Sequence, residues 1–274
     1  MALPVTNLSQ PKELARLSHL GKEYKTLSGD TVVALAGIDL TLADGEFVTV
    51  VGTSGCGKTT LLKILAGLIR PSSGEVLLRG KPVEGPQRDM GIVFQSPVLL
   101  PWRTVLQNVL LPIEVLGWDS GKYADRATEL LEMVGLADFR NKYPSELSGG
   151  MQQRASIVRA LVYDPSLLLM DEPFSALDAM TREQMNLDLE RIWEQSRKTI
   201  LFITHNIQEA AFLGDRVVVM SPRPGRIVDV VPVSLSRPRR LEQLVSDELG
   251  KVVGRIRSLL GPAGVGENPS AGAV

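Results

Sequence analysis

The stretch FVTVVGTSGCGKT, residues 47–59, decides the fold of this chain. Phe47–Val51 is an apolar run of strand length, and Gly52–Thr59 fits the pattern G-x-x-x-x-G-K-[ST]. An apolar helix is expected from Lys58 to Leu68. Glycines let the backbone wrap around phosphate oxygens with its N–H groups pointing inward, and the helix N-terminus adds the positive end of its dipole. The sequence therefore predicts a strand–loop–helix unit that binds phosphate groups.

The residue types in this loop point to a nucleoside triphosphate with Mg²⁺. We expect Lys58 to reach the β- and γ-phosphates and the Thr59 hydroxyl to coordinate the metal. Cys56 occupies a variable position of the pattern, which favours a small, tolerated side chain there. The predicted nucleotide-binding residues of the loop are Gly52, Thr53, Ser54, Gly55, Cys56, Gly57, Lys58, Thr59 and Thr60.

Two later strands end in residues suited to hydrolysis. The apolar run Leu167–Met170 is followed by Asp171 and Glu172. Asp171 could hold Mg²⁺ through its water shell, and Glu172 could polarise an attacking water. The strand expected at Thr199–Thr204 leads directly into His205, and catalytic groups of open α/β sheets gather at the carboxyl edge. These residues are predicted to meet the phosphate loop there.

A further glycine pair opens a helix. Leu147–Arg154 reads LSGGMQQR, in which Ser148 is a good N-cap, and the helix is expected to run to Tyr163. Gly149 and Gly150 allow close approach of the backbone to an anion. On its own, this pattern is equally compatible with a simple helix cap.

In this order, the segments resemble the ATP-binding-cassette (ABC) family from about Leu14 to Val231. The resemblance implies a role for each motif: Walker A at Gly52–Thr59, Q-loop Gln95, signature Leu147–Gln153, Walker B Leu167–Asp171 with Glu172, D-loop Ser175–Asp178 and H-loop His205. Tyr24 falls where the family has its adenine-stacking aromatic, although it could also be an ordinary strand residue.

The resemblance also implies a mechanism with ATP and Mg²⁺ as cofactors. Two copies would pair head to tail, so that each ATP lies between the Walker A loop of one copy and the signature of the other. The implied catalytic residues are Glu172, His205 and Gln95. The implied metal ligands are Thr59, Gln95 and Asp171. Further nucleotide contacts are implied for Tyr24, Ser148, Gly149, Gly150, Gln152 and Asp178.

The fold expected is an α/β P-loop NTPase (RecA-like) core with an N-terminal antiparallel β-subdomain and an inserted helical subdomain. We expect an extension at 1–13 and the cassette at 14–235, with the helical insertion at about 97–163. Thr31–Leu35 and Ile38–Leu42 are expected as two antiparallel strands. A C-terminal helix is expected within 236–260, and 261–274 is expected to be disordered. The face of that helix would be formed by Leu241, Leu244, Val245, Leu249, Val252, Val253 and Ile256.

The composition narrows the function classes. Of 274 residues, 44% are hydrophobic and 22% are charged, which is an ordinary globular balance. A net charge of -1 gives no basic field for nucleic acid, and one cysteine allows no internal disulfide and favours a reducing compartment. Met1–Glu13 lacks a signal pattern, and no apolar run approaches the roughly 20 residues of a membrane helix. A membrane span would have to come from another chain.

The flanks of the Q-loop narrow the family further. The chain is similar to ATPases of nitrate, sulfonate and taurine uptake systems in three segments: Glu84–Gln95, Leu100–Arg103 and Ser221–Arg226. That similarity implies an importer subunit for a small solute, placed peripherally on the cytoplasmic face of the inner membrane. Its partners would be transmembrane permease subunits, a second ATP-binding subunit (a homodimer) and an extracytoplasmic solute-binding protein, with no nucleic acid.

Several alternatives stay open at this stage. The apolar loop Ser96–Arg103 could cover the core of the helical insertion or line a groove that receives a permease helix. The chain could be a soluble ABC ATPase that is not coupled to transport. It could also be an ATP switch without turnover, although Glu172 and His205 argue against that. The C-terminal helix could pack on the core or brace the dimer.

Overall fold

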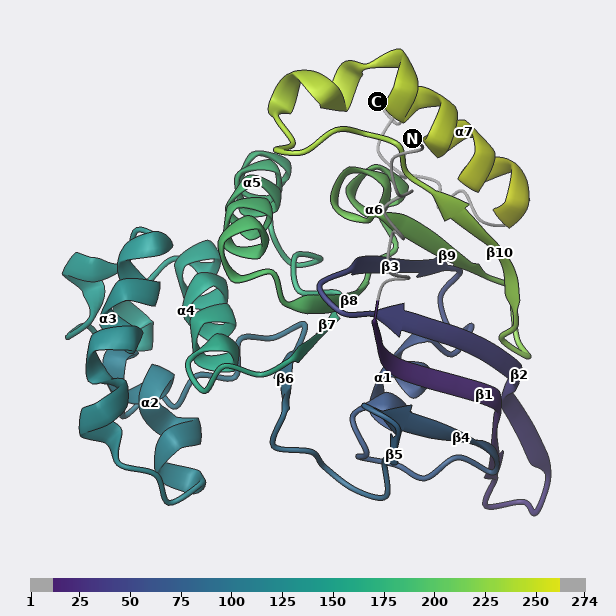
Figure 1. Cartoon of the computed structure of the whole chain (residues 1–274), viewed down its shortest axis with the longest axis horizontal. Coiled ribbons are helices and arrows are strands. Elements are labelled where there is room, and N and C mark those ends of the chain that lie inside the picture. The colour runs from purple at the N-terminus through teal and green to yellow at the C-terminus, as the bar shows by residue number, and fades with distance from the viewer. Residues whose placement is uncertain (1–11, 262–274) are drawn as a thin grey trace, which may run out of the picture.

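The computed structural model describes residues 12–261, which form two β-sheets with α1 between them and a group of helices at one end (Figure 1). The larger sheet has six strands in the order β10-β9-β3-β8-β7-β6, and the smaller has four in the order β2-β1-β4-β5. The six-stranded sheet comprises β3 (Phe47–Gly52), β6 (Met90–Val93), β7 (Leu167–Asp171), β8 (Thr199–Ile203), β9 (Arg216–Met220) and β10 (Ile227–Pro232). All its neighbouring strands are parallel except β9 and β10.

Strand β3 is buried on both faces, which explains its continuous apolar sequence. Val48 and Val50 face the core that contains α1 (Lys58–Leu65) and the smaller sheet. Phe47 faces the opposite core, which contains α5 (Ala179–Ser196) and the inserted helices. The same period of two runs through β7, β8 and β9. The burial of this sheet fixes where the loop after β3 emerges.

The smaller sheet differs from the sequence-based expectation. It comprises β1 (Glu13–Lys25), β2 (Thr31–Ala43), β4 (Ser73–Leu78) and β5 (Lys81–Pro82). The two strands predicted at Thr31–Leu35 and Ile38–Leu42 are one strand, β2, interrupted by Gly37 at a φ of 64°. The register with β1 shifts at the same place, between the pairs Leu20–Ile38 and Lys22–Leu35. This irregularity breaks the alternation of apolar residues, which is why the sequence suggested two strands.

The N-terminal boundary also differs by a residue. Glu13, which was predicted to end the extension, is the first residue of β1 and pairs with Ala43. Residues 1–11 of the predicted extension lie outside the described part of the chain, as do residues 262–274 of the predicted tail.

The inserted helices are α2 (Val105–Val115), α3 (Ala124–Met133) and α4 (Gly149–Leu161). Helix α4 holds the segment that follows β6. Gln153 Nε2 donates to the carbonyl of Phe94 at 3.3 Å, and the Arg159 guanidinium donates to the carbonyls of Pro97 and Val98 at 2.7 Å each. Any displacement of the segment 94–98 must therefore involve α4. Within residues 12–261, no helix is both long and apolar enough to cross a membrane.

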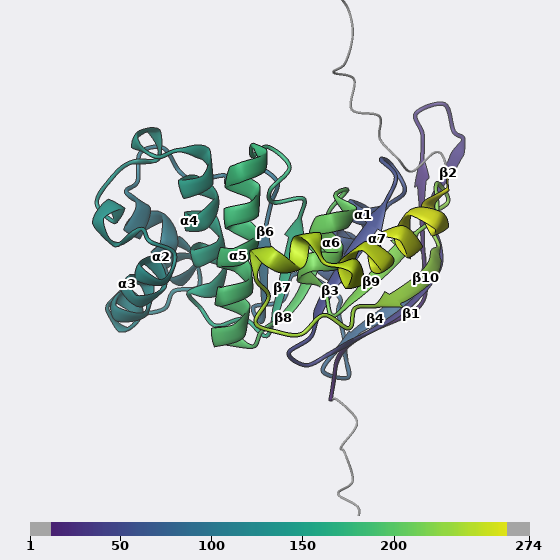
Figure 2. The ribbon, with the colours of Figure 1, turned by 90° about the horizontal axis from the view of Figure 1, so that it is seen from above.

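The C-terminal segment corrects a second expectation. The predicted single helix is a 3-10 helix, η4 (Leu241–Val245), followed by α7 (Asp247–Leu260). Ser246 ends the first and caps the second by accepting the N–H of Leu249 at 3.2 Å. Helix α7 lies beside α6 (Ile207–Leu213), β9 and β10 (Figure 2). Leu249, Val253 and Ile256 are buried in the core that these elements share, whereas Val245 is 88% exposed. Leu244 of η4 also packs against this core, so Leu241, at 46% exposed, and Val245 are the members of the predicted face that lie outside it.

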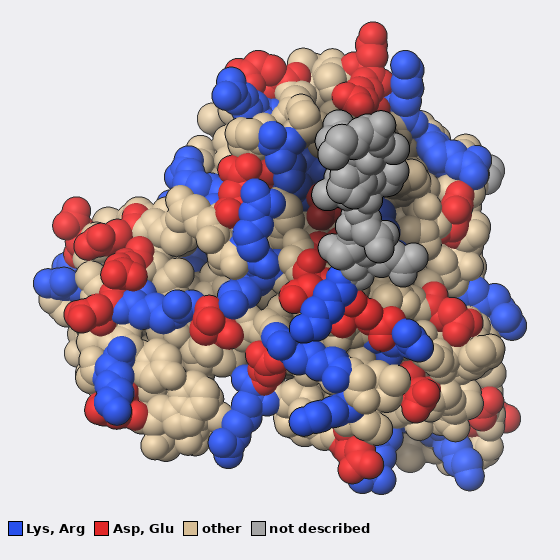
Figure 3. Space-filling view, in the orientation of Figure 1, with Lys and Arg blue, Asp and Glu red and all other residues tan. Residues whose placement is uncertain are grey.

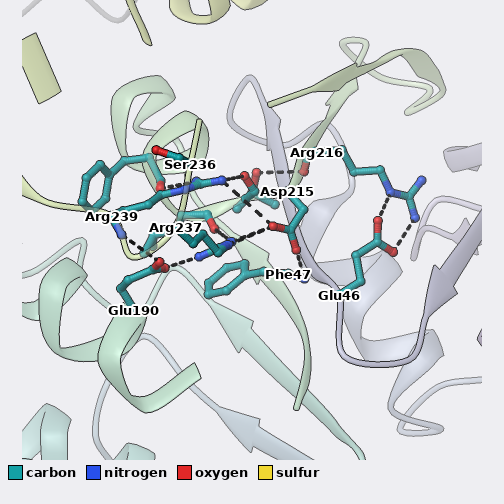
Figure 4. Close-up of polar contacts among 12 residues, drawn as sticks. Glu46, Phe47, Glu190, Asp215, Arg216, Ser236, Arg237 and Arg239 are labelled. Carbon is teal, nitrogen blue, oxygen red and sulfur yellow. Dashed lines mark hydrogen bonds and ion pairs between the residues drawn. The ribbon is translucent and has the colours of Figure 1, made fainter. Parts of the chain in front are cut away.

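Two arginines attach this segment to the core (Figure 4). Arg237 stacks on Trp193 at 3.9 Å from the ring centroid, pairs with Glu190, and binds Asp215 Oδ1 at 2.8 Å. Asp215 Oδ2 in turn accepts the N–H of Phe47, the first residue of β3, at 2.8 Å. The C-terminal segment and the start of β3 thus share one carboxylate.

Arg239 is the most buried of these cations, with 4% of its surface exposed. Its guanidinium donates to the carbonyls of Ala211 at 3.3 Å and Gly214 at 2.8 Å, and to that of Phe212, at the end of α6. Burial lowers the pKa of Arg239 to about 10, so the side chain is still charged at neutral pH. A cation at a helix C-terminus satisfies carbonyls that have no partner within the helix.

We expect Arg239→Ala to lower the free energy of unfolding by about 2–4 kcal/mol, because several carbonyls lose their buried donor. Arg255→Ala is the matched control, since Arg255 forms an exposed pair with Asp229. That change should cost less than about 1 kcal/mol. Urea denaturation of both variants measures the difference, and equal midpoints would show that Arg239 contributes no more than a surface cation.

Candidate nucleotide site

The loop after β3 borders a pocket of about 410 Å³. Most residues predicted for the nucleotide line this pocket: Tyr24, Ser54, Gly55, Gly57, Lys58, Thr59, Thr60, Gln95, Asp171 and Glu172. They come from β1, the phosphate loop, the start of α1, and the ends of β6 and β7. The parallel strands bring them together because their carboxyl ends share one edge of the sheet.

The loop conformation depends on glycine at position 57. Gly57 has a φ of 105°, and a Cβ there would lie 3.0 Å from the carbonyl of Ala34 and 2.7 Å from Leu35 Cδ2. Lys58, which is only 6% exposed, donates from Nζ to the carbonyls of Gly52 at 2.9 Å and Thr53 at 3.2 Å. The loop is therefore curled around the ammonium group that the sequence predicts to bind phosphate.

Three residues predicted for the loop do not line the pocket: Gly52, Thr53 and Cys56. The Cys56 side chain is buried in the core with α1, and burial raises the pKa of its thiol. Gly52 makes room for this sulfur, since a Cβ on Gly52 would approach Sγ to 2.7 Å. The thiol is thus a packing group beneath the loop.

Thr59 and Asp171 form the part of the pocket that suits a hard cation. Thr59 Oγ1 donates to Asp171 Oδ1 at 3.1 Å, and Gln95 lines the same pocket. Burial raises the pKa of Asp171, and the Thr59 hydroxyl opposes that rise. Within residues 12–261, no cluster of three His, Cys, Asp or Glu side chains could hold a metal. A hydroxyl, a carboxylate and an amide oxygen nevertheless fit Mg²⁺, which usually takes few carboxylates and completes its shell with water and phosphate.

Glu172 and His205 form an ion pair beside this group. His205 Nδ1 lies 3.0 Å from Glu172 Oε2, and Lys58 Nζ lies 3.8 Å from Glu172 Oε1. The hydrogen bond to His205 lowers the pKa of Glu172, and the same bond raises the pKa of His205. A carboxylate held anionic accepts a hydrogen bond from water well but is a weak base. The geometry therefore suits Glu172 for orienting a water.

The backbone conformation of Glu172 sets the direction of its side chain. Its φ is 47°, which is uncommon for a residue with a side chain. Its N–H donates to the carbonyl of Ile203 on β8 at 2.9 Å, and its own carbonyl accepts from Ser175 Oγ at 3.0 Å. The turn after β7 therefore binds both the neighbouring strand and the segment 175–178.

The remaining predicted residues form a second group, which does not line the pocket. Ser148 caps α4 by accepting the N–H of Met151 at 3.3 Å. Asp178 caps α5 through Thr181, whose side chain also binds it at 2.6 Å, and these bonds lower the pKa of Asp178. A Cβ on Gly150 would lie 2.9 Å from Thr181 Cγ2, so the two helix starts are adjacent. Gln152, Gly149 and Gly150 belong to the first of these helix starts.

Comparison with known proteins identifies this arrangement. The profile of the family described as ABC transporter matches residues 35–175. An ABC transporter ATP-binding protein of Methanocaldococcus jannaschii, MJ0412, is 51% identical over 224 residues, which cover 82% of this chain and 84% of that protein.

This chain belongs to the ABC transporter family.

Two further proteins are similar to it. The taurine import ATP-binding protein TauB of Pelagibacter ubique is 49% identical over 209 residues, or 76% of this chain and 79% of that protein. The dimeric structure of the ATP-binding cassette MJ0796 in a post-hydrolysis state, bound to ADP and Pi, superposes with a TM-score of 0.70 at 32% identity. That match covers 81% of this chain and 100% of the other. The predicted P-loop NTPase fold of the ABC cassette is confirmed, and the chain is an ATPase.

Sequence reasoning missed Arg223 in this ABC cassette. Arg223 lies in the hairpin between β9 and β10, lines the pocket, and donates to the carbonyl of Gly55 from Nε at 3.3 Å and from Nη2 at 3.2 Å. The hairpin reaches the loop because Gly225 pairs with β2, donating its N–H to the carbonyl of Ala34 at 2.9 Å. Guanidinium has five N–H donors, so one carbonyl does not exhaust it. Nothing in the turn sequence indicates this long-range contact.

We expect Arg223→Ala to weaken ATP binding about tenfold, because Arg223 lines the pocket and its remaining N–H groups can form a charge-assisted hydrogen bond to a phosphate there. Arg226→Ala is the control: Arg226 is exposed in the same hairpin but does not line the pocket. Calorimetric titration with ATP measures both affinities. If the Arg223 variant bound ATP as tightly as the control, the role of Arg223 would be limited to holding the phosphate loop through Gly55.

Proposed function

We propose that this ATPase powers the uptake of a small solute through partner permease subunits, on the cytoplasmic face of the inner membrane. The observation that carries the proposal is the Glu172–His205 pair, whose carboxylate residue Glu172 lines one pocket with Lys58, in a chain 49% identical to a taurine import ATP-binding protein. The solutes proposed are taurine and related sulfonates, nitrate or another small organic solute, delivered by an extracytoplasmic solute-binding protein.

In this proposal, Lys58 and the loop N–H groups bind the β- and γ-phosphates, and Tyr24 stacks on adenine. Thr59, Asp171 and Gln95 would hold Mg²⁺, which supplies charge neutralisation at the phosphates. Glu172 orients the attacking water, and His205 keeps Glu172 ionised and in place. The lowered pKa of Glu172 supports this role, because the carboxylate persists across the neutral range.

A second copy would complete the site. Ser148, Gly149, Gly150 and Gln152 lie outside the pocket of their own chain, so they are available to the nucleotide of a facing copy. The N-terminus of α4 offers N–H donors and a positive dipole end to a γ-phosphate. Asp178, at the adjacent helix start, would transmit the nucleotide state across the seam. The related cassette MJ0796 is dimeric in its post-hydrolysis structure, which supports the pairing of two copies that we propose to be head to tail.

We expect Glu172→Gln to reduce the rate of ATP hydrolysis by about a hundredfold or more, because the amide cannot accept a hydrogen bond as strongly from the attacking water. ATP binding should be retained, and the variant should elute as an ATP-dependent dimer in size-exclusion chromatography. Glu129→Gln, at an exposed position of α3, is the control. Hydrolysis by Glu172→Gln at the rate of this control would remove Glu172 from the catalytic role.

The segment after the Q-loop is proposed as the permease contact. Phe94, Val98 and Trp102 are 42%, 58% and 70% exposed, which is unusual for large apolar side chains grouped along one segment. Gln95, in the same segment, lines the nucleotide pocket, and α4 binds the segment through Gln153 and Arg159. A partner bound there would therefore contact a segment tied both to the pocket and to the signature helix.

To test the coupling, the tagged chain is recovered from detergent-solubilised membranes and the eluate is assayed for ATP turnover. Wild type should bring down a multi-span permease, and the double change Val98→Ala, Trp102→Ala should reduce the yield about tenfold, as expected for apolar anchor residues. Val228→Ala, at an exposed position of β10, is the control.

Recovery of ribosomes or nucleic acid in place of a permease would favour a soluble ABC ATPase. Such a partner needs a continuous basic surface. On the face seen in Figure 3, basic and acidic side chains are interspersed. This distribution supports the hypothesis that the ATPase acts in transport.

A further inference from the structure

A buried carboxyl group lies next to the catalytic histidine. Glu209 is in the first turn of α6 and is 5% exposed. Its Oε2 accepts from Thr204 Oγ1, and Thr204 Oγ1 in turn accepts the N–H of Asn206 at 3.0 Å. Asn206 closes the cycle, because its Oδ1 accepts the N–H of Glu209 at 3.1 Å. The two residues that flank His205 are thus held by one carboxyl group.

This group does more than cap a helix. Asn206 already supplies the N-cap of α6, and among the described residues no donor bonds to Glu209 Oε1. A buried acid with one unpaired oxygen costs stability, and a helix start that is already capped does not require it. Destabilising groups are kept where they contribute to function, and Glu209 lies next to His205.

Three charged groups act on this carboxyl: Arg182 from α5, His205 at the end of β8, and Glu172 at the end of β7. Arg182 also donates to the carbonyls of Phe174 at 3.3 Å and Leu177 at 2.8 Å, in the segment that leads to Asp178. Burial raises the pKa of Glu209 to about 7, and the charge of Glu209 contributes to the raised pKa of His205. A pKa of about 7 places the change of charge of this acid in the neutral range.

We propose that Glu209 is a positioning residue for ATP hydrolysis, which orients His205 through Thr204 and Asn206 and, when ionised, favours the cationic form of His205. The proposal rests on the role proposed above for His205. Both forms of the carboxyl can accept from Thr204, so the orientation is kept in either state. Only the carboxylate favours a charged His205, and a charged His205 holds Glu172 more strongly.

The sign of the pH effect follows. Above pH 7 the carboxylate of Glu209 predominates and supports the His205–Glu172 pair against the loss of the histidine proton. Below pH 7 Glu209 is increasingly neutral, but His205 is protonated by the solution itself. The contribution of Glu209 to turnover should therefore grow as the pH rises from 6 to 8.

The first test is a titration of His205 by NMR, which is feasible because the chain has two histidines, and the other, His19, can be replaced by Asn. Glu209→Gln should move the titration midpoint of His205 to lower pH, because a nearby negative charge is lost. The glutamine keeps an acceptor for Thr204 and carries no burial cost of charge, so the variant should fold. Glu248→Gln, at an exposed position of α7, should leave the midpoint unchanged.

The second test is turnover. Glu209→Ala should lower kcat about tenfold with the KM for ATP within about twofold, and Glu209→Gln should recover most of that loss at pH 6 but not at pH 8. A His205 midpoint unchanged in Glu209→Gln, or a pH profile that superposes on that of wild type, would overturn the proposal. The NMR midpoint is independent of turnover, so a failure of the proposed role of His205 in hydrolysis would be recognised separately.

Discussion

The structure depends on the burial of β3 from both sides. Val48 and Val50 pack into one core and Phe47 into the other, so a shift of the strand by one residue would exchange the side chains that the two cores receive. The phosphate loop begins at the residue where this strand ends. The position of Lys58 relative to the ends of β7 and β8 is therefore set by core packing, and the carboxylate of Asp215 fixes the start of the same strand.

Within the site, two neighbouring carboxylates behave differently because their surroundings differ. Burial raises the pKa of Asp171, and the main partner of this carboxylate is the neutral hydroxyl of Thr59. The hydrogen bond to His205 lowers the pKa of Glu172, and the nearby charge of Lys58 lowers it further. One carboxylate is thus suited to a metal that would supply the missing positive charge, and the other is already paired and ready to orient a water.

Much of this arrangement is contained in the sequence. Strands β3, β7 and β8, the phosphate loop and the N-cap Ser148 are visible as local patterns, because apolar runs and turn residues encode them over a few positions. The smaller sheet was harder, since Gly37 interrupts β2 and hides its length. The C-terminal helix was predicted too long, because Val245 continues an apolar pattern that the packing of α7 does not use. Both differences arise where local periodicity and tertiary packing disagree.

By itself, the sequence determined which residues form the phosphate-loop pattern, which acids follow the strands, and to which family the chain belongs. Only the tertiary structure decided which residues meet. Arg223 reaches Gly55 across 168 positions of sequence, and Glu209 acquires a perturbed pKa only because α6 is buried. The reason is physical: a motif specifies neighbours along the chain, whereas burial, charge and hydrogen-bond partners depend on segments that approach from elsewhere.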